Sequence, residues 1–305
     1  MSTGAAPGRA TPWSAVVVDY RSGDLLDRCV AALLADTSAG APPEVVVVDN
    51  ASGEPGGGAA LRDDLAAQVV VLRPGANLGY GRAANLGIAA TAAPVVAVLN
   101  PDAVVDPGTA AAVLGRFAAD PRLGAVGTRI LNPDGTQYPS ARTAPALGDA
   151  LGHALLGSVA PTNRFTRAYR QLDADPDRPR AVDWLSGAAI WLRREALDEV
   201  GGWDERFFLF MEDVDLCRRL EAAGWGIAYE PGGRVHHVIG ASRAGRRYRS
   251  VVEHHRAAYR YADKWWHGPR RALLPAAAGF LAARASVLLA VEAARPRSGA
   301  AAGTE

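Results

Sequence analysis

Short apolar runs and stretches with helical periodicity alternate through the first hundred residues. The apolar runs are rich in valine and cover residues 14–18, 45–48, 69–72 and 95–99. Apolar positions at helical spacing lie between them, at residues 25–34, 61–67 and 83–92. Unbroken apolar strands that alternate with helices are typical of a parallel sheet covered on both faces. The pattern therefore predicts an α/β fold with a mainly parallel central sheet.

Polar residues follow each of the four expected strands. They are Asp19 and Tyr20, Asp49 and Asn50, Asn77, and Asn100 with Asp102. One polar strand end is explained by a helix cap or a turn, but four at the same sheet edge are not. Ligands of open α/β sheets bind at the carboxyl ends of the strands. The sequence therefore predicts a polar ligand site at this edge.

The alternation becomes less regular after residue 106. Strands are expected over residues 124–130, 184–192, 227–230 and 234–237, and short helices over 114–119 and 194–200. The proline-containing stretch 145–180 has no clear periodicity and is expected to be rich in loops. Residues 1–12 are small and polar, so we expect a disordered N-terminus without a signal peptide.

A cluster of carboxylates opens a helical pattern at residue 212. Glu212, Asp213 and Asp215 directly follow an aromatic run at residues 207–210. One interpretation is that they cap the helix, because the N-terminus favours negative charge. The other is a general base, since apolar surroundings raise the pKa of a carboxylate. The sequence of this segment alone leaves both interpretations open.

The net charge of +1 conceals two oppositely charged parts of the 305-residue chain. Residues 243–305 carry 12 Lys and Arg against 4 Asp and Glu, whereas residues 1–242 carry 21 against 28. A basic tail on an acidic body indicates contact with anions. The two cysteines, Cys29 and Cys217, lack metal-ligand spacing, which favours a reduced, cytoplasmic protein.

The basic tail is expected to be helical, with a strongly apolar segment at residues 272–294. Arg284 interrupts this segment, and a charge at mid-span costs roughly 2.5–3.5 kcal/mol on insertion scales. We therefore expect an amphipathic helix on an anionic membrane surface, anchored by Arg270, Arg271, Arg295 and Arg297. The alternative is that the helix packs on the protein body or on a second copy in a homodimer. Nucleic-acid binding is not expected, because the arginines border an apolar helix.

The polar strand ends also indicate which ligand chemistry to expect. Asp102 directly after a buried strand suits a hard divalent cation, which completes its shell with water and substrate phosphates. Asp49 is placed to accept a hydrogen bond from a pyrimidine imide. Gly79 and Gly81 permit close backbone approach, and Arg82 is a phosphate partner. The glycine spacing matches neither a dinucleotide-binding loop nor a Walker-type loop, so the pattern predicts a nucleoside diphosphate bound with a metal.

Six motifs together resemble those of family 2 inverting glycosyltransferases with the GT-A fold. They are VVVDNAS at 46–52, NLGYG at 77–81, NPD at 100–102, WLSGA at 184–188, GGWDERFF at 201–208 and MEDVDL at 211–216. More narrowly, residues 134–142 and 166–171 resemble those of actinobacterial rhamnosyltransferases. The resemblance covers residues 13–265. It implies a Rossmann-like sheet with a C-terminal helical extension.

The resemblance also implies a role for individual residues. Asp213 matches the catalytic base, with Glu212 and Asp215 in support. Asp102 and His237 match the ligands of Mg²⁺ or Mn²⁺, although Asn100 replaces the family's first aspartate and His236 is an adjacent alternative to His237. The nucleotide sugar is expected on Asp19, Tyr20, Asp49, Asn77, Gly79, Tyr80, Arg82 and Asn100. The acceptor is expected on Trp184, Ser186, Gly187 and Arg142.

These assignments predict transfer of L-rhamnose from dTDP-L-rhamnose to an N-acetylglucosaminyl diphosphoryl-polyprenol, in synthesis of the arabinogalactan linker at the inner face of the plasma membrane. Residues 13–105 would form the donor half, 106–242 the acceptor half, and 243–305 the membrane-associating tail. The alternatives are galactofuranosyl transfer and rhamnosyl transfer to an O-antigen. A scaffold that only binds nucleotides is disfavoured, because Asp102 and Asp213 are both present.

Overall fold

The computed structural model describes residues 11–51, 53–54, 58, 61–142, 160, 162–237 and 247–294. Of the N-terminal segment expected to be disordered, residues 1–10 lie outside this part of the chain. The chain divides into two compact units, which we describe separately. The first contains residues 1–208 and 212–242, and the second contains residues 209–211 and 243–305.

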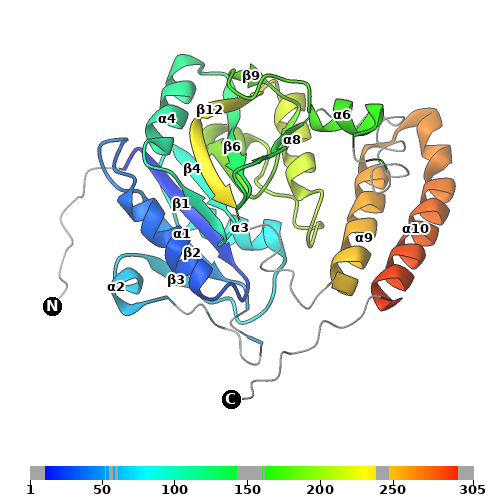
Figure 1. Ribbon diagram of the computed structural model, residues 1–305, viewed down its shortest axis with the longest axis horizontal. Helices are drawn as coiled ribbons and strands as arrows, with labels where there is room; N and C mark the ends of the chain where they lie inside the picture. The colour runs from blue at the N-terminus through cyan, green and yellow to red at the C-terminus, as the bar shows by residue number, and fades with distance from the viewer. Residues whose placement is uncertain are drawn as a thin grey trace. The chain divides into compact units, whose positions relative to one another are not determined.

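The first unit is built on a mixed sheet with strand order β3-β2-β1-β4-β11-β6-β12-β5 (Figure 1). These strands are β1 (Trp13–Asp19), β2 (Glu44–Asp49), β3 (Val70–Leu72), β4 (Val95–Leu99), β5 (Ala103–Val105), β6 (Leu123–Leu131), β11 (Ala189–Arg193) and β12 (Gly226–His237). The first four are mutually parallel, and β12 is parallel to β6. Only β11 and β5 run against their neighbours on this path. The prediction of a mainly parallel sheet is therefore confirmed.

Four short described strands border this sheet or form a separate ribbon beside it. Strand β7 (Gln137–Tyr138) pairs with β6, and β9 (Arg180–Ala181) pairs with β12. Strand β8 (Ala141–Arg142) pairs with a fourth short strand, β10 (Trp184–Leu185), in a two-stranded antiparallel ribbon. This ribbon joins two of the segments in which acceptor residues were predicted.

Helices cover both faces of the sheet because every central strand is apolar on both sides. Helices α1 (Asp24–Ala35) and α4 (Thr109–Ala119) share a buried cluster with the face that carries Ala15 and Val17. Helix α3 (Tyr80–Ala89) covers the opposite face. A Cβ on its Gly87 would lie 2.3 Å from Cγ1 of Val16, so only glycine permits this close packing. The other helices of this unit are α2 (Asp63–Ala66), α6 (Arg164–Arg170), α7 (Arg194–Glu199) and α8 (Glu212–Ala222).

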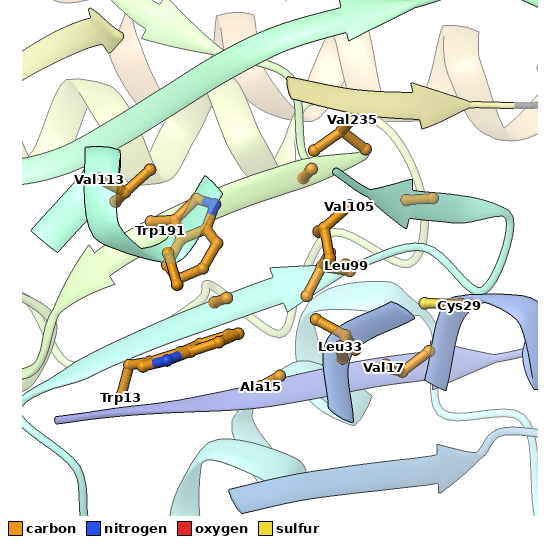
Figure 2. Close-up of a cluster of buried hydrophobic side chains, with 14 of the residues drawn as sticks. Trp13, Ala15, Val17, Cys29, Leu33, Leu99, Val105, Val113, Trp191 and Val235 are labelled. Carbon is orange, nitrogen blue, oxygen red and sulfur yellow. The ribbon is translucent and has the colours of Figure 1, made fainter. Parts of the chain in front are cut away.

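A cluster of buried apolar side chains lies between one face of the sheet and helices α1 and α4 (Figure 2). Trp13 and Trp191 pack in it with ring centroids 4.6 Å apart and ring planes tilted by 40°. Leu99 of β4 and Val235 of β12, both near the carboxyl ends of their strands, belong to the same cluster. Burial of each such side chain contributes about 1.5–3 kcal/mol. The core thereby stabilises the positions of the ends of β4 and β12, where part of the site is expected.

Three sequence predictions of local structure need correction. The apolar run 184–192 is two strands, because the chain breaks at Ser186, whose N–H donates to the carbonyl oxygen of Ser140 at 2.8 Å. Residues 227–230 and 234–237 form one strand, β12, with an irregularity between Glu230 and Arg234. Helix α6 lies in the stretch expected to be loops. The side chain of Asn163 caps it by accepting from two backbone N–H groups.

The second unit is a pair of helices, α9 (Arg247–Trp265) and α10 (Leu274–Ala294), joined through the 3-10 helix η2 (Gly268–Leu273). The two helices lie side by side (Figure 1). Arg284 of α10 turns toward α9, where its Nη1 lies 2.9 Å from Nε2 of His255. Phe210, which we expected near the base, packs in this unit with its ring 5.4 Å from that of His254.

Helix α10 differs from the amphipathic helix that the sequence predicted. Its apolar side chains are distributed around the whole helix, and Val287 and Val291 are exposed. Residues 268–294 are long and apolar enough to cross a membrane, a criterion that some helices of soluble proteins also meet. The mid-span charge of Arg284 is directed at His255, and Ser286 and Glu292 are the other polar side chains of α10.

Candidate active site

Two buried carboxylates lie side by side at the ends of β1 and β2. Asp19 and Asp49 are register partners in the parallel pair, and neither is exposed. Burial raises the pKa of Asp19 above its usual range, and hydrogen bonds from Ser22 oppose this shift. Oδ2 of Asp49 lies 3.9 Å from Nε of Arg73, and the neighbouring Tyr20 donates its hydroxyl to Glu54 at 2.7 Å. These contacts gather polar side chains at the carboxyl ends of β1 and β2.

The loop before α3 is held by the side chain of Asn50. Its Oδ1 accepts from the N–H of Leu78 at 2.8 Å, and its Nδ2 lies 3.2 Å from both Oδ1 of Asn77 and the carbonyl oxygen of Gly79. Gly79 has φ of 82°, and a Cβ there would lie 2.5 Å from the carbonyl oxygen of Phe208. Glycine is therefore required at this position. The loop delivers the N-terminus of α3 to the same edge of the sheet.

A second cluster joins the end of β4 to the end of β12. Because His237 pairs with Ala103 in the antiparallel β12–β5 ladder, its Nε2 lies 3.0 Å from Oδ1 of Asp102 and 3.4 Å from Nδ2 of Asn100. His236 points the other way, to Asp106 at 3.1 Å, and is half exposed. The strand alternation thus resolves which histidine faces Asp102.

The donor atoms of this cluster fit a divalent cation. Asp102 and His237 are buried. Oδ1 of Asp102 faces Nε2 of His237 at 3.0 Å without the alignment of a hydrogen bond, and Nδ1 of His237 has no hydrogen-bond partner within the described chain. No group of three or more His, Cys, Asp and Glu residues that could bind a metal occurs in the same described ranges. Two protein ligands suit Mg²⁺ or Mn²⁺ when water and substrate phosphates complete the shell.

Asp213 is held at the start of α8 by two backbone N–H groups. Gly187 donates to its Oδ2 at 2.9 Å, and Val214 donates to its Oδ1 at 2.8 Å. Burial raises the pKa of Asp213, although these two N–H groups and Arg142 oppose the shift. The N–H of Asn100 donates to the carbonyl oxygen of Ala188 at 2.9 Å. Gly187 therefore contacts Asp213, and the next residue, Ala188, contacts Asn100 of the cluster that contains Asp102.

The two other carboxylates of α8 differ from Asp213 in their surroundings. Glu212 is buried, and its pKa is raised well above the usual range by burial and then by the charge of Asp213. Its Oε2 has no partner among the residues that the structure describes. Asp215 instead forms an ion pair with Arg219 at 2.8 Å, and Arg219 donates to the carbonyl oxygen of Val200 at 2.7 Å. Asp215 therefore fastens α8 to the end of α7.

Arg142 lies at the centre of an aromatic cluster near Asp213. Its guanidinium carbon is 4.6 Å from the ring of Trp184 and 5.6 Å from the rings of both Tyr138 and Tyr169. It also donates to the carbonyl oxygen of Pro139 at 2.7 Å and to the hydroxyl of Tyr138 at 2.9 Å. The ring of Tyr138 in turn meets that of His237 at 6.3 Å. The positive charge of Arg142 thus lies near Asp213, and Tyr138 links Arg142 to His237.

Comparisons with known proteins show the family and the fold of this chain. A family model described as glycosyltransferase-like family 2 matches residues 11–292. The chain belongs to glycosyltransferase family 2. An N-acetylglucosaminyl-diphospho-decaprenol L-rhamnosyltransferase of Mycobacterium tuberculosis is 40% identical over 271 residues, which are 84% of this chain and 87% of that protein. The protein is therefore a glycosyltransferase enzyme.

Solved structures show the fold of this family 2 glycosyltransferase. GalNAc-T7, crystallised with UDP, GalNAc and Mn²⁺, aligns with a TM-score of 0.55 at 16% identity. The alignment covers 76% of this chain and 44% of that one. The mannosyltransferase PcManGT of Pyrobaculum calidifontis, in complex with GDP-Man and Mn²⁺, aligns with a TM-score of 0.54 at 15% identity, over 95% of this chain and 77% of that one. The predicted GT-A fold is confirmed.

Most of the residues predicted for the glycosyltransferase site lie in one connected network, but some differ from their predicted role. The hydroxyl of Tyr80, expected to face the nucleotide sugar, donates instead to the carbonyl oxygen of Gly187 at 2.6 Å. Arg82 is mostly exposed, and its Nε lies 3.4 Å from Oε2 of Glu205. Trp184 is buried under Arg142. Asp215, predicted to support the base, forms its ion pair with Arg219 on the same helix.

Sequence reasoning missed Asn50, Tyr138 and Tyr169 as site residues. Asn50 orders the loop before α3, and the two tyrosines flank Arg142. Both tyrosines lie in the stretches 134–142 and 166–171, whose resemblance to rhamnosyltransferases was the available signal. Asn50 follows Asp49 at a polar strand end, and that position was the signal for it.

Proposed function

We propose that this enzyme transfers L-rhamnose from dTDP-L-rhamnose to an N-acetylglucosaminyl diphosphoryl-polyprenol, with inversion at the anomeric carbon, in cell-wall linker synthesis. The Mycobacterium tuberculosis relative, an N-acetylglucosaminyl-diphospho-decaprenol L-rhamnosyltransferase, supports this proposal through its match over 87% of its length. The observation that carries the catalytic part is the partly buried carboxylate of Asp213, fixed by Gly187 next to the Asp102 and His237 pair.

The donor is proposed to lie across the carboxyl ends of β1, β2 and β4. Asp49, with Asp19 and Tyr20 beside it, receives the thymine ring. The loop from Asn77 to Gly79 places the N-terminus of α3 at the diphosphate, because the N–H groups and dipole of a helix N-terminus favour anions. Asn100 and Arg82 complete the donor site in this proposal. The sugar then lies between this loop and Asp213.

Asp102 and His237 would hold Mg²⁺ or Mn²⁺, with the amide of Asn100 alongside. When bound, such an ion neutralises the diphosphate. The support from this chain is chemical: a buried carboxylate oxygen and an imidazole nitrogen lie within 3.0 Å of each other. The solved neighbours that contain Mn²⁺ share the fold.

Asp213 is proposed to remove the proton from the acceptor hydroxyl. The acceptor oxygen then forms a bond to the anomeric carbon while the bond from that carbon to the diphosphate oxygen breaks. The proton remains on the carboxyl group of Asp213, and the electron pair leaves with the nucleoside diphosphate. Burial raises the pKa of Asp213, which makes it a stronger base than an exposed aspartate. A single displacement from the opposite face inverts the configuration.

Glu212 and Asp215 support the base in different ways in this proposal. The pKa of Glu212 is raised well above its usual range, which favours the protonated form, and in that form Glu212 would add no second charge beside Asp213. Asp215 holds the helix through Arg219. The proposed acceptor wall consists of Ser186, Gly187, Trp184 and Arg142. The charge of Arg142 suits the diphosphate of the lipid-linked acceptor.

The helical tail is proposed to keep the enzyme on the anionic inner face of the plasma membrane, as a peripheral protein. The exposed apolar surface of α10 and the arginines of η2 support this location. Flotation with anionic and neutral vesicles tests it. Binding to anionic vesicles should fall when Arg270 and Arg271 are changed to Gln, and self-association without vesicle binding would instead indicate a homodimer. The limits 13–105, 106–242 and 243–305 remain the proposed functional division.

A transfer assay tests the proposed reaction. Purified full-length protein receives radiolabelled dTDP-L-rhamnose and N-acetylglucosaminyl diphosphoryl-polyprenol, with Mg²⁺, Mn²⁺ or a chelator. We expect a rhamnosylated lipid that requires a divalent ion and is absent with Asp213→Asn. Transfer only from a galactofuranosyl donor, or only to another acceptor, would overturn the narrow assignment but leave the family intact.

A further inference from the structure

We infer that Tyr80 is a positioning residue for the catalytic base, acting through Gly187. The inference rests on the proposed role of Asp213, and it changes the role of Tyr80 from the donor contact that the sequence predicted. The structure connects three residues from α3, from the break between β10 and β11, and from α8. Each link in this connection is a short hydrogen bond inside the first unit.

Gly187 is held on both sides of its Cα. Its carbonyl oxygen accepts from the hydroxyl of Tyr80 at 2.6 Å, and its N–H donates to Oδ2 of Asp213 at 2.9 Å. A glycine has more accessible backbone conformations than any other residue, so its orientation depends strongly on such bonds. The tyrosine hydroxyl therefore fixes the peptide group between Gly187 and Ala188. It thereby limits rotation of the peptide group between Ser186 and Gly187, whose N–H binds Asp213.

Tyr80 itself is rigid. Its N–H donates to the carbonyl oxygen of Phe208 at 2.8 Å, and its ring packs edge-on against Trp203 at 5.7 Å. Burial raises the pKa of its hydroxyl well above the usual value, and the charge of Asp213 adds to this effect. The hydroxyl consequently remains protonated and stays a hydrogen-bond donor at every pH at which the enzyme works.

The same tyrosine begins the helix whose N-terminus is proposed to meet the donor diphosphate. Gly79, directly before it, must be a glycine because the loop passes against Phe208. The donor loop and the base are thereby joined through a single side chain. A displacement of the loop is transmitted to Gly187, and from there to the carboxylate of Asp213.

Tyr80→Phe removes one oxygen and leaves the ring in place. We expect kcat to fall about ten- to a hundredfold, because small misplacement of a catalytic group costs up to that factor. The KM for the donor should change less than about twofold in the same experiment. The acidic limb of the pH profile of kcat should move to higher pH. The hydrogen bond from the Gly187 N–H lowers the pKa of Asp213, and a weaker bond from this N–H lowers that pKa less.

Besides Tyr80, the titratable and charged groups that face Asp213 are Glu212 and Cys217 on α8, Arg142 on β8 and Tyr169 on α6, and their surroundings must stay unchanged in the variant. Tyr229→Phe is the matched control, because this buried tyrosine also donates to a carbonyl, that of Pro176 at 3.1 Å, away from the site. It should leave kcat, KM and the acidic limb unchanged.

A second variant separates the hydrogen bond from the fold. 4-Aminophenylalanine at position 80 keeps a donor at the end of the ring and should restore most of kcat and the original acidic limb. Equal losses in the amino and Phe variants would overturn the inference, as would an unshifted limb in Tyr80→Phe. A higher donor KM with unchanged kcat would show a donor contact instead.

The proposed reaction and this inference can fail independently. If the wild-type enzyme does not transfer rhamnose, the proposed function fails, and the inference is tested by the carboxyl ¹³C titration of Asp213. That titration should give a higher pKa in Tyr80→Phe than in the wild type and in Tyr229→Phe. The same pKa in all three proteins would overturn the inference whatever the substrate is.

Discussion

Replacement of Asp213 by Asn removes the proposed base and keeps the size of the side chain. The carboxylate accepts one backbone N–H on each oxygen, from Gly187 at 2.9 Å and from Val214 at 2.8 Å. An amide has only one oxygen, so its NH₂ group must face one of these donors. A buried donor left without a partner costs about 1–3 kcal/mol. The neutral amide offsets part of this cost, because burial destabilises the carboxylate, as the raised pKa of Asp213 indicates.

The variant should therefore fold, and its transfer rate should fall much more than its stability. General base catalysis contributes about 10²–10⁴-fold, so we expect the rate constant for transfer to decrease by that factor. Donor affinity should stay within about threefold, because neither of the two broken or weakened bonds involves the loop at Asn77–Gly79. Single-turnover transfer with excess enzyme measures the rate, and calorimetry measures donor binding. A rate within tenfold of the wild type, with normal donor binding, would refute the role of Asp213.

Three further predictions concern neighbouring groups. Glu212→Gln should be stabilised relative to the wild type by an amount that grows with pH. Above pH 4.5 the folded wild type keeps the proton of Glu212 while the unfolded chain loses it. The free energy of unfolding of the wild type therefore falls by about 1.4 kcal/mol per pH unit until the raised pKa is passed. Gly187→Ala should fold, since its Cβ would lie 3.6 Å from Oδ2 of Asp213, but should slow transfer by about 10² by occupying space beside the base. His237→Gln should raise the metal concentration for half-maximal activity at least about tenfold, because even outer-shell changes cost 10–100-fold.

Each of these predictions has its own measurement and control. Urea unfolding of wild type and Glu212→Gln at pH 5 and 8 should show a difference that grows with pH, and a constant difference would contradict the raised pKa of Glu212. Gly187→Ala should keep the unfolding temperature and donor affinity, and normal transfer would mean that the space beside Asp213 is not used. His236→Gln is the matched control for the metal titration, since His236 faces Asp106. Equal effects of both histidine changes would contradict the assignment of His237.

The positions of the polar strand ends could be predicted because β1 to β4 are apolar runs that end at marked polar residues. The break at Ser186–Gly187 could not, because the run from Trp184 to Leu192 has the composition of one strand. Bonds to Ser140 and Asp213, both distant in sequence, impose the break. Local sequence does not contain these partners.

The choice between His236 and His237 shows a similar limit. Successive side chains of a strand point to opposite faces, so the sequence requires that only one histidine faces the site. Which one it is depends on the register of β12 with β5, where His237 pairs with Ala103. The tail is a third case: its apolar length was evident, but the direction of Arg284 toward His255 required the neighbouring helix.

The most direct test of the central claim is the anomeric configuration of the product. Purified enzyme is incubated with dTDP-L-rhamnose labelled with ¹³C at the anomeric carbon, N-acetylglucosaminyl diphosphoryl-polyprenol and Mg²⁺, and the one-bond carbon–proton coupling of the product is measured by NMR. We predict a rhamnosylated lipid whose anomeric configuration is opposite to that of the donor. A product with the donor's configuration would contradict a single displacement with Asp213 as the base, and no product would contradict the proposed reaction.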